Sequence, residues 1–232
     1  GGSISYGGTR GDGYHSSIDA DEVMASIFGL WHAEHGYVDL ILSGGSSNFD
    51  IDRVIPIGAA NRHETSNASA RHYAGELGVG MNFGSDDFKH GPFASYAWQQ
   101  VTVHGFAEDS LDSTAMWFDD FERESSIGRL GYQFEGNVGN FHPFGRVAYA
   151  KQNDTDPPSV RAGSNTMNGH FTFDGFIYAE DFVEAELGLG WAVNDRTNVN
   201  VSYRGRFNDD NHDFDALALD FQMFFPKAVP AP

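Results

Sequence analysis

The segment TNVNVSYRGRF, residues 197–207, has the side-chain pattern that decides the fold. Its residues alternate between an apolar and a polar set, namely Val199, Val201, Tyr203 and Phe207 against Asn200, Ser202, Arg204 and Arg206. Successive side chains of a β-strand point to opposite faces of its sheet. The segment therefore predicts a strand with one apolar and one polar face.

Four other segments repeat this two-residue period, at residues 38–43, 75–83, 183–193 and 216–225. In 183–193 the apolar set includes Leu187, Leu189 and Trp191, whereas Glu184, Glu186 and glycines share the opposite face. Regular alternation over five segments indicates an all-β chain.

Composition limits the possible functions. The chain has 14 Lys and Arg against 33 Asp and Glu, a formal charge of −19, so it lacks the basic surface that binding nucleic acid requires. It contains no cysteine, which excludes disulfides and thiolate chemistry. Nothing in the composition marks a second domain, so we expect one domain over residues 1–232, without a cofactor or a metal.

The polar faces indicate which side of the strands meets solvent. They are rich in Gly and Arg rather than in the Lys, Thr and Glu usual on a solvated strand, and aromatic residues recur near strand ends. Both features are typical of a transmembrane β-barrel with an outward apolar face and an aromatic girdle. The sequence thus favours a barrel of the bacterial outer membrane. A soluble β-sandwich that binds a ligand remains an alternative at this point.

A single-chain outer-membrane barrel has an even number of antiparallel strands, with long loops outside and short turns on the periplasmic side. The turns expected there are 33–36, 84–91, 135–139 and 193–197, and a long external loop is expected at 45–68. Placing a strand at 157–167 completes this arrangement, which predicts a twelve-stranded antiparallel barrel. The other seven strands are expected at 2–9, 20–33, 89–106, 114–134, 141–152, 170–178 and 197–207.

The same alternation assigns side chains to the two faces of the barrel. The polar residues expected to face the lumen are Asp39, Glu76, Arg129, Arg146, Glu184, Glu186, Arg204, Arg206 and Asp220. The apolar residues expected to face lipid are Leu187, Leu189, Val199, Val201, Leu217, Leu219 and Phe221. Charges of both signs in a narrow lumen must be hydrated or paired, so we expect ion-pair networks there.

Residues 90–134 resemble the autotransporter barrels attached to GDSL-type esterases. The resemblance lies in Gly91-Pro92-Phe93, the Trp98 strand that ends in VHGFAED, and Phe118-Asp119-Asp120, in that order. It implies a translocator barrel that helps to export, and then anchors, an amino-terminal passenger. The partners it implies are outer-membrane lipid and lipopolysaccharide, the passenger segment and the barrel-assembly machinery.

Catalysis is not expected in this chain, because esterase chemistry would belong to the passenger and no Gly-x-Ser-x-Gly elbow occurs. His32 and His35 have the wrong spacing for a zinc motif and are expected to be turn residues. The chain starts in a predicted strand, so the passenger and the pore helix are expected to be absent from it. A plain outer-membrane pore or a barrel-rim hydrolase remains the alternative function.

Overall fold

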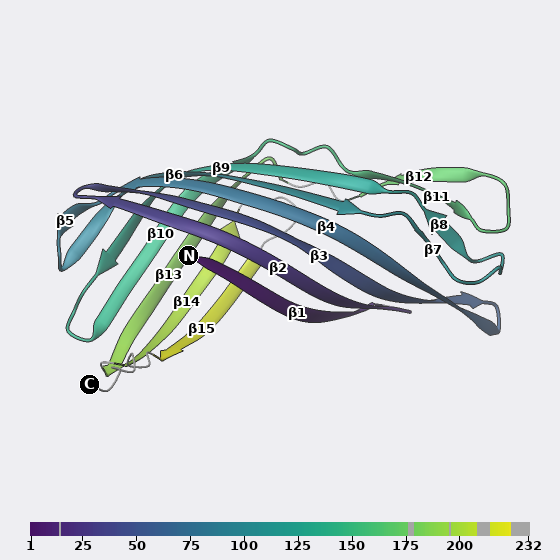
Figure 1. Cartoon of the computed structure of the whole chain (residues 1–232), viewed down its shortest axis with the longest axis horizontal. Coiled ribbons are helices and arrows are strands. Elements are labelled where there is room, and N and C mark those ends of the chain that lie inside the picture. Colours follow the sequence, from purple (N-terminus) through teal and green to yellow (C-terminus); the bar gives the residue numbers. More distant parts are fainter. Residues whose placement is uncertain (14, 176–178, 195, 208–213, 224–232) are drawn as a thin grey trace, which may run out of the picture.

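The computed structural model of this protein describes residues 1–13, 15–175, 179–194, 196–207 and 214–223 (Figure 1). Strands and turns make up this part of the chain, in which no helix is long and apolar enough to span a membrane. The last two residues of the strand expected at 216–225, Phe224 and Phe225, and the tail after them lie outside the described residues.

Most strands form one curved antiparallel sheet of eleven strands (Figure 1). Its path runs through β1 (Gly2–Gly13), β2 (Ser16–Ala33), β3 (Gly36–Ile57), β4 (Ala60–Met81), β6 (Phe88–Val103), β9 (Phe121–Gly136), β10 (Phe141–Gln152), β13 (Asp181–Asn194), β14 (Thr197–Phe207) and β15 (Phe214–Met223). The short strand β5 (Phe83–Ser85) pairs with β6 off this path. Within the described residues β1 and β15 each pair with one strand only, so the sheet is an open arch.

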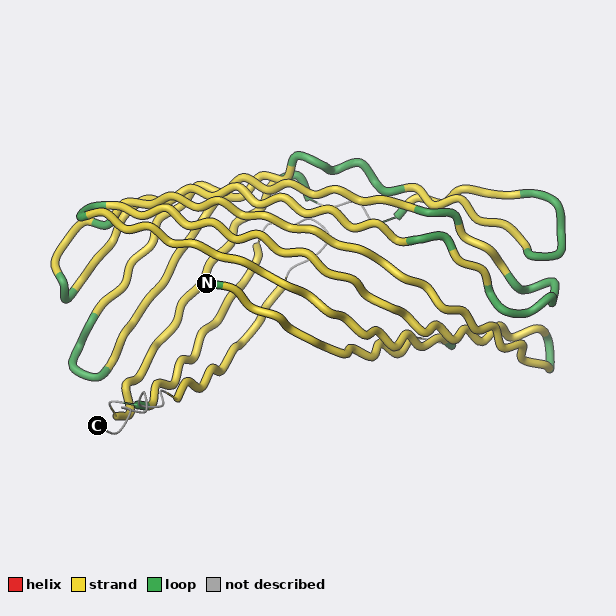
Figure 2. Tube along the Cα trace, viewed as in Figure 1, coloured by secondary structure: helices red, strands yellow, loops and turns green. Residues whose placement is uncertain are grey.

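The antiparallel order gives the arch two different ends (Figure 2). The short connections β2–β3, β5–β6, β9–β10 and β13–β14 share one end, here called the short-turn end. These are the four turns that the sequence predicts for one side. The opposite end, here called the hairpin end, carries the tip of the β3–β4 hairpin and the long β6–β9 and β10–β13 connections.

A second sheet of four strands lies at the hairpin end (Figure 1). Its order is β12 (His170–Asp174), β11 (Ser159–Ser164), β8 (Met116–Phe118) and β7 (Phe106–Ala107). The sequence-based expectation of one strand over 114–134 therefore differs from the structure, which has β8 and β9 there. Gly105 N–H donates to the Asp120 carboxylate between them, which stabilises the break.

The strands expected at 157–167 and 170–178 form in part, as β11 and β12, but do not enter the main sheet. β10 pairs directly with β13, from Phe141 opposite Trp191 to Lys151 opposite Asp181. This continuous ladder leaves no position between β10 and β13 for two more strands. The main sheet path consequently differs from the twelve-stranded wall that the sequence predicts.

The expectation of a long loop at 45–68 is wrong. These residues belong to β3 and β4, which pair without a register shift from Gly36 opposite Met81 to Ile57 opposite Ala60. Gly58 closes the hairpin with φ of 61°, a left-handed conformation that glycine adopts without steric cost. Backbone pairing along the whole hairpin holds both its apolar part, around Ile51 and Ile55, and its polar part, residues 58–68, in regular geometry.

The sheet buries few large apolar side chains. Most of its buried apolar residues are alanines, such as Ala148 and Ala150, whereas Leu217 is 77% and Leu187 61% exposed. A water-soluble sandwich would place such leucines in its core. In this sheet the leucines are exposed and small residues are buried, the reverse of a soluble sandwich.

Candidate functional site

Ladder register places all nine polar residues that the sequence assigns to the lumen on one face of the main sheet. Directly paired residues of a sheet share a face, as do residues two apart in one strand. Glu184 pairs with Arg206, Glu186 with Arg204 and with Arg146 on its other side. Asp39, Glu76, Arg129 and Asp220 join the same face through the remaining ladders.

Seven of these residues form two adjacent ion-pair clusters, together called the charged belt: Glu76, Arg129, Glu184 and Arg206, and Arg146, Glu186 and Arg204. Glu184 is one centre, because its carboxylate lies 2.7 Å from Arg129 Nε and 3.3 Å from Arg206 Nη2. Glu186 is the other, 2.9 Å from Arg146 Nε and 3.1 Å from Arg204 Nη2.

The Arg129 to Glu184 pair shows that the belt lies on the concave side. Arg129 is on β9 and Glu184 on β13, and β10 lies between them. Side chains of strands that are not neighbours approach each other across the hollow of a curved sheet. Glu76 of β4 extends the belt further, 4.0 Å from Arg129 Nη1.

The belt is partly removed from water. The Arg129 side chain is 18% exposed and that of Glu186 14%. Arg206 also lies 4.0 Å over the ring of Phe182, a buried residue of β13. Partly buried charges are favourable only when paired, and mixed signs satisfy this requirement here.

Asp39 and Asp220 share the concave face but not the belt. In the described part of the chain neither has an ion pair within 4.0 Å. Asp39 instead extends over Gly78 of β4, whose missing side chain leaves room for the carboxylate. The structure therefore brings together seven of the nine predicted residues.

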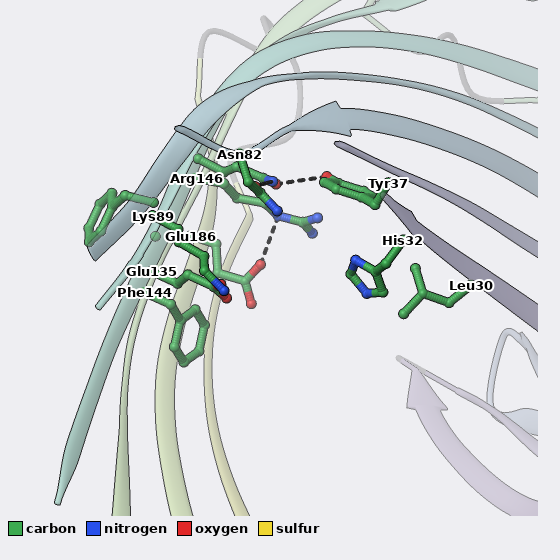
Figure 3. Close-up of a pocket in the computed structure, with 12 residues that line it drawn as sticks. Leu30, His32, Tyr37, Asn82, Lys89, Glu135, Phe144, Arg146 and Glu186 are labelled. Carbon is green, nitrogen blue, oxygen red and sulfur yellow. Dashed lines mark hydrogen bonds and ion pairs between the residues drawn. The ribbon is translucent and has the colours of Figure 1, made fainter. Parts of the chain in front are cut away.

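A cavity of about 410 Å³ lies on the concave side near the short-turn end (Figure 3). His32, Tyr37, Lys89 and Glu135 line it, and the Arg146 to Glu186 pair connects it with the belt. The residue types in this cavity can bind a polar chain by hydrogen bonds and charge.

Tyr37 is a concave-face residue that the sequence analysis missed. Its hydroxyl donates to Gln133 Oε1 at 3.0 Å, from β3 across β4 and β6 to β9. The ring crosses β4 at Gly80, where an added Cβ would lie 2.3 Å from a ring carbon. The sequence feature that could have indicated this contact is a tyrosine on one strand opposite a glycine on the next, Tyr37 opposite Gly80.

His32 and His35 lie at the junction of β2 and β3. The expectation that both are turn residues holds for His35 and is wrong for His32, which belongs to the end of β2. The ring centroid of His32 is 6.2 Å from that of Tyr37. Across the described residues, no group of three or more His, Cys, Asp or Glu could hold a metal ion.

The opposite, convex face carries the seven apolar residues assigned to lipid. Ladder pairs such as Leu189 with Val201 and Val201 with Leu219 place them together. All are exposed except Val199, which is half-buried.

Comparison with known proteins identifies the fold and the family. The family model for the autotransporter β-domain matches residues 1–204. The chain belongs to the autotransporter β-domain family. The translocator domain of the autotransporter NalP from Neisseria meningitidis matches in structure with a TM-score of 0.65, at 13% identity, over 97% of this chain and 80% of that one.

Two esterase-type proteins are among the relatives of this autotransporter β-domain. Lipase 1 of Photorhabdus luminescens is 26% identical over 185 residues, 78% of this chain and 28% of the relative. Esterase EstA of Pseudomonas aeruginosa is 25% identical over 217 residues, 89% and 33% respectively. The resemblance to esterase autotransporters is thus confirmed, and the chain spans about a third of these relatives or less.

Proposed function

We propose that this autotransporter β-domain closes into a transmembrane barrel of the bacterial outer membrane and exports an amino-terminal passenger. The observation that carries the proposal is the division of the sheet into two faces. The charged belt lies on the concave face, and large exposed apolar side chains cover the convex face. A barrel wall between lipid and a water-filled lumen requires that division.

Closure of the sheet follows from the cost of open strand edges. β1 and β15 have unpaired edges in the described arch, and unpaired peptide groups are not tolerated in lipid. Pairing β1 with β15 would remove both edges. In such a barrel the short-turn end faces the periplasm and the hairpin end the cell exterior, because external loops are the longer ones.

The twelve-stranded wall stays a prediction for the closed barrel. Continuous pairing of β10 with β13 favours a wall without β11 and β12. The twelve-stranded form would require that ladder to open and both strands to leave β8 and β7. The wall without β11 and β12 and the twelve-stranded wall can be distinguished by the distance between β10 and β13, which is short only in the first.

The two faces then acquire separate roles. The belt residues, with Asp39 and Asp220, line the lumen as a polar conduit, while Leu187, Leu189, Val199, Val201, Leu217, Leu219 and Phe221 contact lipid. The passenger, outer-membrane lipid with lipopolysaccharide, and the barrel-assembly machinery are the proposed partners. The family is one of translocators and not of catalysts, so esterase activity in relatives such as EstA is assigned to their additional length.

Surface display tests this function. A signal peptide and an epitope tag are joined ahead of Gly1, and intact cells are probed with antibody and with added protease. Export predicts a tag that antibody reaches on intact cells and protease removes. A barrel that folds in the outer membrane but leaves the tag in the periplasm would show a plain pore instead. Deleting β14 and β15 supplies a control without an assembled wall.

A further inference from the structure

The connection between β6 and β9 contains a strap, residues 108–115, that lies on the β3–β4 hairpin at the hairpin end. Glu64 of β4 accepts hydrogen bonds from two hydroxyl groups of the strap, Ser110 Oγ at 2.6 Å and Thr114 Oγ1. Glu64 is 1% exposed, although it belongs to a hairpin that projects from the sheet. The strap is what covers it.

An arginine of β3 attaches the strap at a second place. Arg53 Nε and Nη2 donate to the two oxygens of Glu108 at 2.9 and 2.7 Å, and Nη2 also donates to Thr114 O at 3.1 Å. Met116 N–H donates to Glu108 at 2.7 Å. Such a bidentate arginine pair fixes direction as well as distance.

The second sheet holds the strap from its other side. Asn165, just after β11, donates through Nδ2 to Glu108 O at 2.7 Å and to Ser110 O at 3.1 Å, and its N–H donates to Ala115 O at 2.9 Å. Arg62 forms an ion pair with Asp112. The strap is therefore a fixed segment with contacts to the hairpin and to the β11 end.

Strand parity shows on which face the strap lies. Glu64 and Glu76 are an even number of residues apart in β4, whose ladder with β3 has no register shift. Glu64 consequently points to the same face as Glu76 of the charged belt. Arg53 is the ladder partner of Glu64 and shares that face. The strap thus lies on the concave side of the sheet.

We propose that the strap narrows the external mouth of the conduit and so limits what passes through the barrel. This inference rests on the proposed function, because only a closed barrel makes the concave side a lumen. Leu111 is the strap's one large apolar side chain, and it is 84% exposed. The polar contacts of Glu64 and Glu108 keep the strap folded inward against the wall.

Single-channel conductance in planar lipid bilayers tests the constriction. The double variant Ser110→Ala/Thr114→Val removes both hydroxyl donors to Glu64 and leaves every charge in place. We expect it to conduct severalfold more than the wild-type chain. The control is Arg161→Ala, which removes the ion pair of β11 with Asp119 and the contact of the guanidinium with Trp117 but none of the hydrogen bonds of the strap. It should conduct like wild type.

A second arm does not depend on loosening the strap. The chain has no cysteine, so Leu111→Cys can be labelled alone with a polyethylene glycol maleimide, which should lower the conductance. The same label on Arg161→Cys should not. Equal conductance of wild type and the double variant, or no effect of the Leu111→Cys label in a conducting barrel, would overturn the constriction. A wild-type chain without heat-modifiable gel migration in lipid would overturn the barrel itself.

Discussion

Arg129 on β9 contacts Glu184 on β13 across the intervening strand β10, with 2.7 Å between Nε and Oε2. The same carboxylate lies 3.3 Å from Arg206 on β14. One acidic side chain therefore connects three strands of the wall on its concave face. Its removal should weaken the wall more than the loss of an exposed charge.

The variant Glu184→Gln tests this contribution. It leaves Arg129 and Arg206 as partly buried charges without their shared carboxylate, and a hydrogen bond to a charged group contributes about 1.5–3 kcal/mol. We expect the free energy of unfolding in lipid vesicles to fall by about that amount, measured from urea titrations by tryptophan fluorescence. Glu34→Gln, in the exposed β2–β3 turn, is the control and should unfold like wild type. The same urea midpoint for Glu184→Gln and Glu34→Gln would show that Glu184 does not stabilise the wall.

The close approach of the Phe144 ring to Gly188 leads to a second prediction. A Cβ added at Gly188 would lie 2.2 Å from Phe144 in the neighbouring strand β10, so Gly188→Ala must displace the ring. Overpacking of this kind costs about 1–3 kcal/mol. Gly128→Ala on β9 has nothing within 4 Å of the new methyl group and should be neutral or slightly stabilising. The comparison uses the same urea titration, and a neutral Gly188→Ala would show that the ring is free to move.

Disulfide formation distinguishes the two possible walls. Tyr149 and Val183 are ladder partners in β10 and β13, and Cα atoms of opposed residues are about 4.5–5.5 Å apart, within the range that a disulfide spans. We expect Tyr149→Cys/Val183→Cys to cross-link on oxidation in the folded, membrane-inserted state, detected by a shift in non-reducing gels. Two strands inserted between them would separate the pair by about 14 Å. Folded protein that does not cross-link would support twelve strands.

The sequence was informative where one face of a strand meets a different environment from the other. Regular alternation in 183–193 and 197–207 places Glu184, Arg204 and Arg206 on polar faces, and the ladder pairs Glu184 with Arg206 and Glu186 with Arg204. Pairing partners are a different matter. The parity of the short turns predicts a strand at 157–167, but whether β11 pairs with β10 or with β8 depends on distant backbone groups that turn parity does not encode.

The hairpin end was the least predictable part of the molecule. Phe49, Ile51, Ile55 and Ile57 follow a two-residue period that predicts a strand, but Arg53 interrupts it and residues 58–68 are mostly small or polar, so the segment is assigned to a loop. The strap contacts join Glu108 to Arg53 and Ser110 to Glu64, far apart in the sequence. An acidic loop and an isolated arginine do not indicate such a pairing before the fold is known.

The central claim is that the convex face meets lipid and the concave face meets water, and a pair of arginine substitutions tests it most directly. Leu189 is on the convex face and Asn200 on the concave face, one strand away. A charge at mid-bilayer costs about 2–4 kcal/mol in a barrel wall, so Leu189→Arg should lose that much folding free energy in lipid vesicles, scored by heat-modifiable gel migration. Asn200→Arg should fold almost as well as wild type. Equal folding free energies for Leu189→Arg and wild type would contradict the account.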